Sequence, residues 1–302
     1  MGLHLIIGAS GQVGQHLLQQ VRERGLEGLG TYNASPEAGL RKLDARDRDE
    51  VFAVVSTTRP GTIYLPASLT HVDYCELHPE ETRAINISGV RHVVDAARET
   101  GAKVVYFSSD YVFDGRTGGY SESSEPNPIN EYGRQKLEAE HYVASYAQSY
   151  LIVRTAGVFS WERQGKNFIT RLIQTLRSGR GWSVPADQIN NPTYAPNLAR
   201  AVVELALEGG DGLFHVCGPE PVDRYSLACE AARLFGLDPS LIKACATSDL
   251  GQIAPRPLNA SMKVEKAASR LKLPLISYGE GLAAMAAEQT PAAPEHNRAG
   301  AL

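Results

Sequence analysis

A tyrosine and a lysine four positions apart are the residues of this chain best suited to proton chemistry. Tyr132 and Lys136 stand in the segment NEYGRQKL, 130–137. On a helix this spacing places both side chains on one face. An ammonium close to a phenol lowers the pKa of the phenol from about 10, so the tyrosine can exchange a proton near neutral pH. The pair therefore predicts an acid–base centre, although a surface Tyr/Lys pair has the same spacing.

Two serines upstream add a possible binding group for a polar substrate atom. The apolar run VVYF ends in Ser108 and Ser109. In parallel sheets, ligands bind at the carboxyl ends of the strands. A serine hydroxyl placed there could orient a carbonyl oxygen beside the tyrosine. The alternative is that these serines only end the strand.

A glycine turn follows the first apolar run, 3–7, and opens an amphipathic segment. Gly8 allows a tight turn, Gly11 lets the backbone approach a pyrophosphate, and Gly14 lets the helix lie close to the sheet. The pattern predicts a dinucleotide site, with a purely structural turn as the alternative. The cofactor contacts predicted in this turn are Gly8, Ser10, Gly11, Gln12, Val13 and Gly14.

The choice of dinucleotide is read after the second strand, about 20 residues beyond the turn. The sequence TYNAS there lacks the Asp or Glu that would bond a ribose diol. Asn33 and Ser35 could instead bond a 2′-phosphate, with Arg41 nearby, although no arginine stands at the turn itself. We therefore predict NADP(H), with NAD(H) as the alternative. Asp44, after an expected third strand, is predicted to contact the adenine unless it caps a helix.

Alternation of short apolar runs with amphipathic stretches predicts the elements that position these residues. Strands without polar alternation are typical of a parallel sheet that is covered on both faces. The expected fold is an α/β doubly wound parallel sheet of the Rossmann type. The expected strands are 3–7, 29–32, 62–65, 102–108, 151–154 and 213–216, and the expected helices are 12–24, 47–55, 79–100, 130–146, 167–177 and 196–208.

The alternation loosens after Val158, where loops rich in proline follow. We expect a cofactor-binding domain made of 1–155 with 190–220. A smaller C-terminal substrate-binding lobe, 156–189 with 221–288, is expected to lie over the carboxyl edge of the sheet. Residues 289–302 lack periodicity and are predicted to form a flexible tail.

Composition excludes several classes of protein. A net charge of −4 over 302 residues argues against nucleic acid as a partner. No signal peptide and no apolar stretch of about 20 residues is visible, so we expect a cytoplasmic protein without a membrane partner. The four cysteines form no CxxC pair and the histidines are scattered, which predicts reduced thiols and no metal site.

The segment FSSDYVFDG, 107–115, followed by Tyr132-Gly133-x-x-Lys136, resembles the dTDP-4-dehydrorhamnose reductase family of the extended short-chain dehydrogenase/reductase superfamily. The resemblance extends in order over most of the chain. Other segments that carry it are GYSE at 119–122, PNP at 126–128, PA at 66–67, VDYCE at 72–76, PE at 79–80, IN at 85–86, RT at 154–155, KNF at 166–168, Gln188 through PT at 192–193, and RP at 256–257.

This resemblance implies a reaction and a role for each central residue. Ser109 would orient the substrate carbonyl, Tyr132 would be the general acid, and Lys136 would bind the nicotinamide ribose and tune the tyrosine. The implied reaction is reduction of the C4 ketone of a nucleotide-linked 4-keto-6-deoxysugar. The residues implied to line the cofactor are Pro66, Ala67 and Ser68, with Asn86 supporting a proton relay beneath Lys136.

One position departs from the family pattern. The family often carries a bulky aromatic residue near Gly157, so this glycine is expected to widen or reshape the sugar pocket, with Trp161 as a candidate replacement. The sugar and the nucleotide stay open. Arg154 is a further candidate for a substrate diphosphate. The predicted substrate contacts are Ser108, Asp110, Tyr111, Val112, Phe113, Gly157, Lys166, Asn167 and Arg256.

Two other functions remain as alternatives. The family resemblance also includes a non-catalytic, NADP-binding regulatory subunit, the β subunit of methionine adenosyltransferase. The second alternative is an epimerase or dehydratase of the same superfamily. A dehydratase needs an acidic residue beside the catalytic serine, and Asp110 has this position. The intact set of Ser109, Tyr132 and Lys136 favours an enzyme, which is expected to be a monomer or a homodimer.

Overall fold

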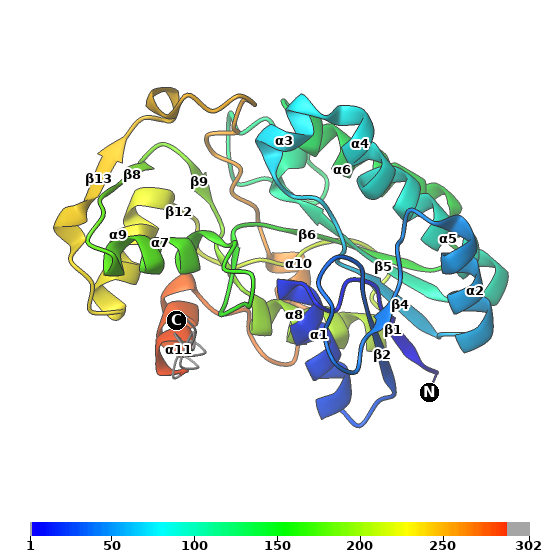
Figure 1. Cartoon of the computed structure of the whole chain (residues 1–302). Helices are drawn as coiled ribbons and strands as arrows, with labels where there is room; N and C mark the ends of the chain where they lie inside the picture. The colour runs from blue at the N-terminus through cyan, green and yellow to red at the C-terminus, as the bar shows by residue number, and fades with distance from the viewer. Residues whose placement is uncertain (1, 289–302) are drawn as a thin grey trace, which may run out of the picture.

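The computed structural model describes residues 2–288 and contains a central sheet of seven parallel strands (Figure 1). The strand order is β11-β6-β5-β4-β1-β2-β3. Its strands are β1 (His4–Ile6), β2 (Gly28–Tyr32), β3 (Arg41–Lys42), β4 (Thr62–Leu65), β5 (Lys103–Ser109), β6 (Tyr150–Thr155) and β11 (Gly212–His215). The six predicted strands are all present, and each end agrees within one residue.

The strand order reverses between β1 and β4. From β1 the chain winds outward through β2 and β3, whereas β4, β5, β6 and β11 extend the sheet in the opposite direction. In doubly wound sheets, ligands bind in the crevice outside the carboxyl ends of the strands at this reversal. The predicted Rossmann fold is therefore confirmed, and the crevice lies between the glycine turn after β1 and the loop after β4.

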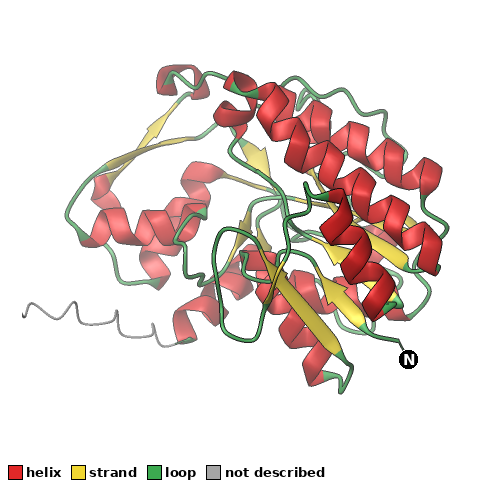
Figure 2. Cartoon of the chain, turned by 45° about the vertical axis from the view of Figure 1, so that its right-hand side comes forward, coloured by secondary structure: helices red, strands yellow, loops and turns green. Residues whose placement is uncertain are grey.

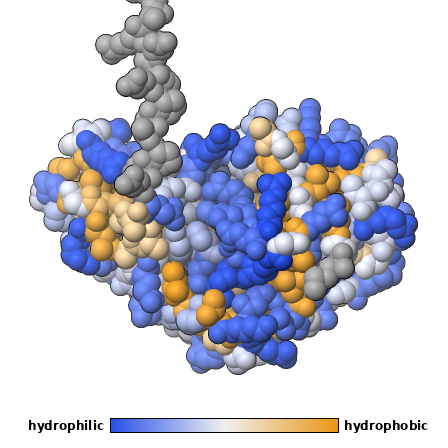
Figure 3. Space-filling view, turned by 90° about the horizontal axis from the view of Figure 1, so that it is seen from below, coloured by the Kyte–Doolittle hydropathy of each residue, from blue (hydrophilic) through white to orange (hydrophobic). Residues whose placement is uncertain are grey.

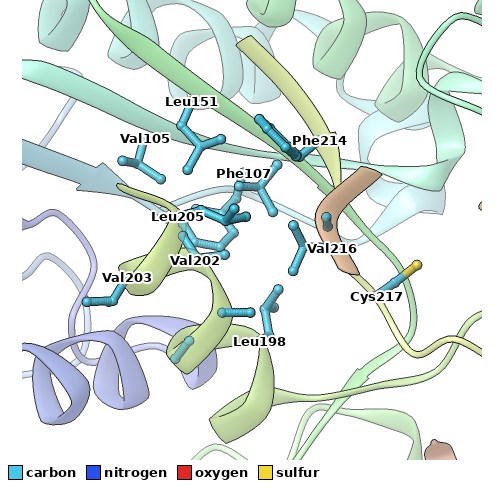
Figure 4. Packing of buried hydrophobic residues seen from close by; sticks show 14 of the residues in the cluster. Val105, Phe107, Leu151, Leu198, Val202, Val203, Leu205, Phe214, Val216 and Cys217 are labelled. Atoms are coloured by element: carbon cyan, nitrogen blue, oxygen red, sulfur yellow. The ribbon is translucent and has the colours of Figure 1, made fainter. Parts of the chain in front are cut away.

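Helices cover both faces of the sheet (Figure 2). On one face, α8 packs its apolar side chains, including Leu198, Val202 and Leu205, against the sheet (Figure 4). A second apolar cluster fills the other face. The helices are α1 (Gln12–Glu23) with α8 (Ala195–Leu207) on the first face, and α2 (Arg48–Thr58), α5 (Gly89–Thr100) and α6 (Glu131–Tyr146) on the second.

The helix predicted over 79–100 is confirmed, but it contains a π-helical turn and is preceded by a short helix that was not predicted. The chain forms α3 (Val72–Leu77), α4 (Pro79–Arg83), a π-helical turn η1 (Ala84–Ser88) and then α5. A π turn commonly marks a functional site inside a helix. Here it carries Asn86, whose side chain bonds the loop after β4 and α6. The sequence analysis did not predict this π turn.

A smaller lobe lies beside the sheet and has its own apolar core (Figure 1). We retain the predicted division into 1–155 with 190–220 and 156–189 with 221–288 as a proposal, and the predicted tail, 289–302, lies outside the described residues. The paired strands are β7 (Val158–Phe159) with β10 (Thr193–Tyr194), β8 (Trp182–Pro185) with β13 (Ile242–Cys245), and β9 (Ile189–Asn190) with β12 (Val222–Asp223). The remaining elements are η2 (Asp110–Val112), α7 (Phe168–Arg177), α9 (Arg224–Leu234), η3 (Pro239–Leu241), η4 (Thr247–Leu250), α10 (Glu265–Ala268) and α11 (Tyr278–Ala287).

The face seen in Figure 3 is largely hydrophilic at its centre, with apolar residues in smaller groups. Within residues 2–288, no helix is both long and apolar enough to cross a membrane. Over the same residues, no three His, Cys, Asp or Glu side chains gather as potential metal ligands.

Candidate active site

The glycine turn after β1 is a close-packed backbone cradle. A Cβ at Gly14 would lie 2.1 Å from the Gly8 carbonyl oxygen, and Gly8 itself has a φ of +95°. Gly11 precedes α1 as its N-cap, and no side chain caps the helix. The N–H groups of the first turn of α1 are therefore free of a competing side-chain acceptor, which suits a pyrophosphate. This geometry fits a bound dinucleotide.

The loop after β4 adjoins this cradle. The Ala67 N–H donates to the Ile7 carbonyl at 3.3 Å, and a Cβ at Gly8 would lie 2.9 Å from the Ala67 Cβ. Pro66, Ala67 and Ser68 are thus brought to the turn that holds Ser10 and Val13. Gln12 behaves differently, because its side-chain amide donates to the Ser160 hydroxyl of the lobe at 3.1 Å.

The ribose end of the crevice lies after β2, where Asn33 and Ser35 follow the last strand residue. Asp44 accepts hydrogen bonds from the Arg46 guanidinium, which hold the pKa of its carboxyl below the usual value, and Asn33 adds to this effect. The helix cap is instead Asp47, which accepts from the Glu50 N–H at 3.0 Å. The helix-cap alternative for Asp44 is therefore wrong, and its contact with adenine stays a prediction.

Ser109, Tyr132 and Lys136 come together at the carboxyl end of β5. Ser109 is the last residue of β5, and its hydroxyl donates to Asp110 Oδ1 at 2.8 Å. Tyr132 and Lys136 lie in the first turns of α6 and are only 7% and 3% exposed. Gly133 allows this approach, since a Cβ there would lie 2.1 Å from the Tyr111 carbonyl oxygen.

The two acid–base groups differ from the sequence-based expectation in their pKa values. Burial raises the pKa of the Tyr132 phenol, which the nearby Ser109 hydroxyl partly opposes, so the expected lowering by Lys136 is not found. The Lys136 Nζ donates to the Phe107 carbonyl at 2.9 Å and lies 5.8 Å from the centre of the Tyr132 ring. Burial lowers the pKa of Lys136 to about 7. A half-charged lysine cannot stabilise a phenolate as a full cation would.

Asp110 contributes a third perturbed group. Burial raises the pKa of its carboxyl to about 6, although hydrogen bonds from Ser109 and Asn190 oppose this rise. The ring of Tyr111 meets that of Tyr132 edge-on, with 5.6 Å between their centres. Asp110 and Tyr111 therefore both lie near the Tyr132 phenol.

Asn86 has no direct hydrogen bond to Lys136. Its amide oxygen accepts from the Ser68 hydroxyl and the Leu69 N–H, each at 2.9 Å, and its amide nitrogen donates to Gln135 Oε1 at 2.9 Å. Asn86 therefore ties the loop after β4 to α6 beside Lys136. The proton relay stays a prediction.

Several predicted substrate residues are structural in this geometry. Val112 and Phe113 have no exposed surface, and the Phe113 ring stacks on Tyr120 with 4.2 Å between centres. Ser108 is 4% exposed and its hydroxyl has no partner among the described residues. The Trp161 indole donates to the Met285 carbonyl in the lobe at 2.8 Å, and its replacement of the missing aromatic stays a prediction.

Gly157 lies where the lobe meets the end of β6. It has a φ of +51°, and a Cβ there would lie 3.3 Å from both Asn190 Oδ1 and Pro192 Cα. The same Asn190 bonds Asp110. Gly157 thus adjoins the polar group around the serine, and its effect on the width of the sugar pocket stays a prediction.

The basic candidates have different roles in the structure. Arg154 is committed to Glu140, with its Nη2 2.6 Å from Oε2, and both side chains are almost fully buried. Arg256 pairs with Asp73 at 2.9 Å. Lys166 is exposed, and Asn167 caps α7 by accepting from the Thr170 N–H at 3.0 Å.

Arg224, the first residue of α9, is a candidate that the sequence reasoning missed. Its guanidinium lies over the Phe168 ring, 4.4 Å from the ring centre, and it has no salt bridge within residues 2–288. Burial lowers the pKa of the Arg224 guanidinium. The nearby Arg256 lowers this pKa further, whereas Tyr111 opposes the lowering. No spacing in the sequence connects Arg224 to the serine and tyrosine, because the fold of the lobe makes this contact.

Comparison with known proteins identifies the family. The family model described as the RmlD substrate binding domain matches residues 3–290. The chain belongs to this family. It is 29% identical to a dTDP-4-dehydrorhamnose reductase of Aggregatibacter actinomycetemcomitans over 274 residues, which covers 87% of this chain and 90% of that relative.

Two further members extend the comparison. Methionine adenosyltransferase 2 subunit beta of Danio rerio is 30% identical over 278 residues, which covers 89% of this chain and 84% of that protein. The crystal structure of a dTDP-4-dehydrorhamnose reductase from Bacillus anthracis in complex with NADP has a TM-score of 0.87 and 29% identity. It covers 94% of this chain and 99% of that one.

Proposed function

We propose that this member of the family is an NADPH-dependent reductase of the C4 ketone of a nucleotide-linked 4-keto-6-deoxysugar. The observation that carries the proposal is the assembly of Ser109, Tyr132 and Lys136 at the carboxyl end of β5, on the same edge of the sheet as the glycine turn after β1. The related reductases and the NADP complex of one of them support it.

In this proposal the dinucleotide would bind along the crevice at the carboxyl edge of the sheet. The backbone of the Gly8–Gly14 turn would hold the pyrophosphate, the residues Asn33 and Ser35 the adenosine ribose, and Lys136 the nicotinamide ribose. The bound reduced nicotinamide would supply the hydride. Its neighbours Ala67 and Ser68 would fix the orientation of the ring from the loop after β4.

Tyr132 would supply the proton. The phenol is protonated at neutral pH even at its ordinary pKa of about 10, and burial raises that pKa further, so the phenol can act as a donor. Ser109 would hold the substrate carbonyl oxygen within reach of this phenol. The phenolic proton then passes to the oxygen as negative charge develops on it, which is general acid catalysis.

The substrate diphosphate would lie toward the lobe. Arg224 has no carboxylate partner in the described part of the chain, and Arg256 lies close enough to lower its pKa. A dianionic diphosphate would offset the repulsion between these two guanidiniums. We therefore assign this pair, rather than Arg154, to the diphosphate.

The test is a panel of nucleotide-linked 4-ketosugars with NADPH and NADH, followed by loss of absorbance of the reduced nicotinamide. Tyr132→Phe should abolish turnover while NADPH still binds, as measured by calorimetry. Unchanged turnover in this variant would refute the proposed role of the tyrosine.

A non-catalytic regulatory subunit is the second candidate, favoured by the 30% identity to the methionine adenosyltransferase subunit. It predicts a stoichiometric partner enzyme in a pull-down and no reduction of any sugar in the panel. Such a protein would not need the intact Ser109, Tyr132 and Lys136. Product analysis on the same panel separates the reductase from an epimerase or dehydratase.

A further inference from the structure

A loop of the smaller lobe reaches the ribose end of the cofactor crevice. In the loop 160–167, the Gln164 side-chain amide lies 3.4 Å from the Ser35 hydroxyl, and an Arg163 Nη1 lies 3.6 Å from Glu37 Oε2. Ser35 and Glu37 stand just after β2, which ends at Tyr32. In this fold the substituent on the 2′ position of the adenosine ribose is read at that place.

Internal contacts fix the position of this loop. The Trp161 carbonyl accepts from Gln15 of α1 at 3.2 Å, and the Trp161 indole bonds α11. At the other end, Glu162 Oε1 accepts from the Lys166 and Asn167 N–H groups at 2.6 and 2.8 Å. The loop thus bridges the sheet and the lobe, and its tip is held over the residues after β2.

The segment that contains Asn33 and Ser35 has no cation of its own. Residues 28–40 contain no lysine or arginine, and Glu37 is their only charged residue. A 2′-phosphate bound beside Asn33 and Ser35 would therefore meet a local negative charge. Among the described contacts of this segment, Arg163 is the cationic side chain that reaches it.

We propose that Arg163 is the specificity-determining residue that binds the 2′-phosphate of NADP(H), supplied by the lobe and not by the turn after β2. This inference rests on the proposed function, because it assumes a dinucleotide in the crevice. The pair with Glu37 is long and its side chains are 74% and 34% exposed, so it holds Arg163 weakly. A phosphate dianion offers a stronger partner.

Arg41 and Lys42 are the competing cations. They form β3, opposite Thr31 and Tyr32 in the register of β2, and both side chains are exposed. The two sources of positive charge, the lobe and β3, make different predictions. Arg163 belongs to the lobe, so its contact with the phosphate would join the lobe to the cofactor domain, whereas Arg41 lies within the cofactor domain.

The experiment measures binding by isothermal titration calorimetry, without substrate. The ligands are NADPH, NADH, adenosine 2′,5′-bisphosphate and 5′-AMP. Arg163→Ala should weaken NADPH and the bisphosphate by about tenfold or more and leave NADH and 5′-AMP unchanged, because only the charge-assisted bonds to the 2′-phosphate are lost. Arg163→Lys should recover part of the loss, and Glu37→Gln should retain or increase NADPH affinity.

Arg180→Ala, which removes another exposed arginine of the lobe, is the matched control and should bind all four ligands as the unmodified protein does. An equal loss for NADPH and NADH in Arg163→Ala would overturn the inference. So would no loss there, or the selective loss in Arg41→Ala or Lys42→Ala instead. If the unmodified protein binds neither dinucleotide, the proposed function itself fails, which is a distinguishable result.

Discussion

The ion pair between Glu140 and Arg154 provides a sharp test of how the site is supported. Arg154 donates to Glu140 through Nε at 2.8 Å and through Nη2 at 2.6 Å. The side chains are 5% and 3% exposed. Glu140 lies one helical turn after Lys136, and its charge partly offsets the lowering of the Lys136 pKa. Glu140→Gln would leave a buried guanidinium without its counter-charge.

Removal of one partner from a buried ion pair costs about 3–5 kcal/mol. A total stability on the order of 10 kcal/mol makes this a large fraction. The melting temperature should fall by on the order of 10 °C. The matched control is Glu138→Gln on the same helix, because Glu138 also forms short pairs, at 2.8 Å with Arg83 and 3.1 Å with Arg91. Those side chains are 34–46% exposed, so the control should lose about 1 kcal/mol or less.

Urea denaturation and thermal melting of the two variants at pH 7 measure this difference. Equal losses in Glu140→Gln and Glu138→Gln would refute the argument from burial. The double variant Glu140→Met with Arg154→Leu supplies a second test, since it removes both charges. It should be more stable than Glu140→Gln, because no unpaired charge remains in the interior.

Three further outcomes follow from particular residues. Lys136 is charged in the unfolded chain up to about pH 10.5 but is largely neutral in the fold above about pH 7. Its contribution to the free energy of unfolding therefore rises with pH between these values. Urea denaturation at pH 6.5 and 9 should show this rise in the unmodified protein and not in Lys136→Met. Burial lowers the pKa of His215 to about 3, so stability should fall by about 1.4 kcal/mol for each pH unit below 6.5, and acid denaturation of His215→Gln should lack this component. Gly14→Ala forces a Cβ against the Gly8 carbonyl and should lower the free energy of unfolding by about 1–3 kcal/mol and also weaken NADPH binding. Gly279→Ala is the control and should change neither property, because the nearest atom to its Cβ would lie 3.9 Å away. Equal melting temperatures for the two variants would contradict the packing argument.

Local patterns in the sequence were sufficient to predict the sheet and the shared face of Tyr132 and Lys136. Buried parallel strands need continuous apolar runs, and a helix packed against a phosphate-binding turn needs glycine at fixed intervals. Tyr132 and Lys136 share a face because the helix repeat is fixed by backbone geometry. These features depend on neighbours within a few residues, so one sequence reveals them.

Burial and contacts between distant segments were decided only by the tertiary structure. Lys136 has a depressed pKa because α6 and β5 enclose it, although the sequence indicated a full cation. The sequence made Arg154 a candidate for binding a phosphate, but in the structure Arg154 pairs with Glu140. Arg224 lies near Tyr111 and Asp110, although no spacing in the sequence connects these residues. The contact of the loop 160–167 with Ser35 likewise joins segments far apart in the chain. Desolvation and charge pairing depend on what surrounds a group in space, and no local pattern encodes those surroundings.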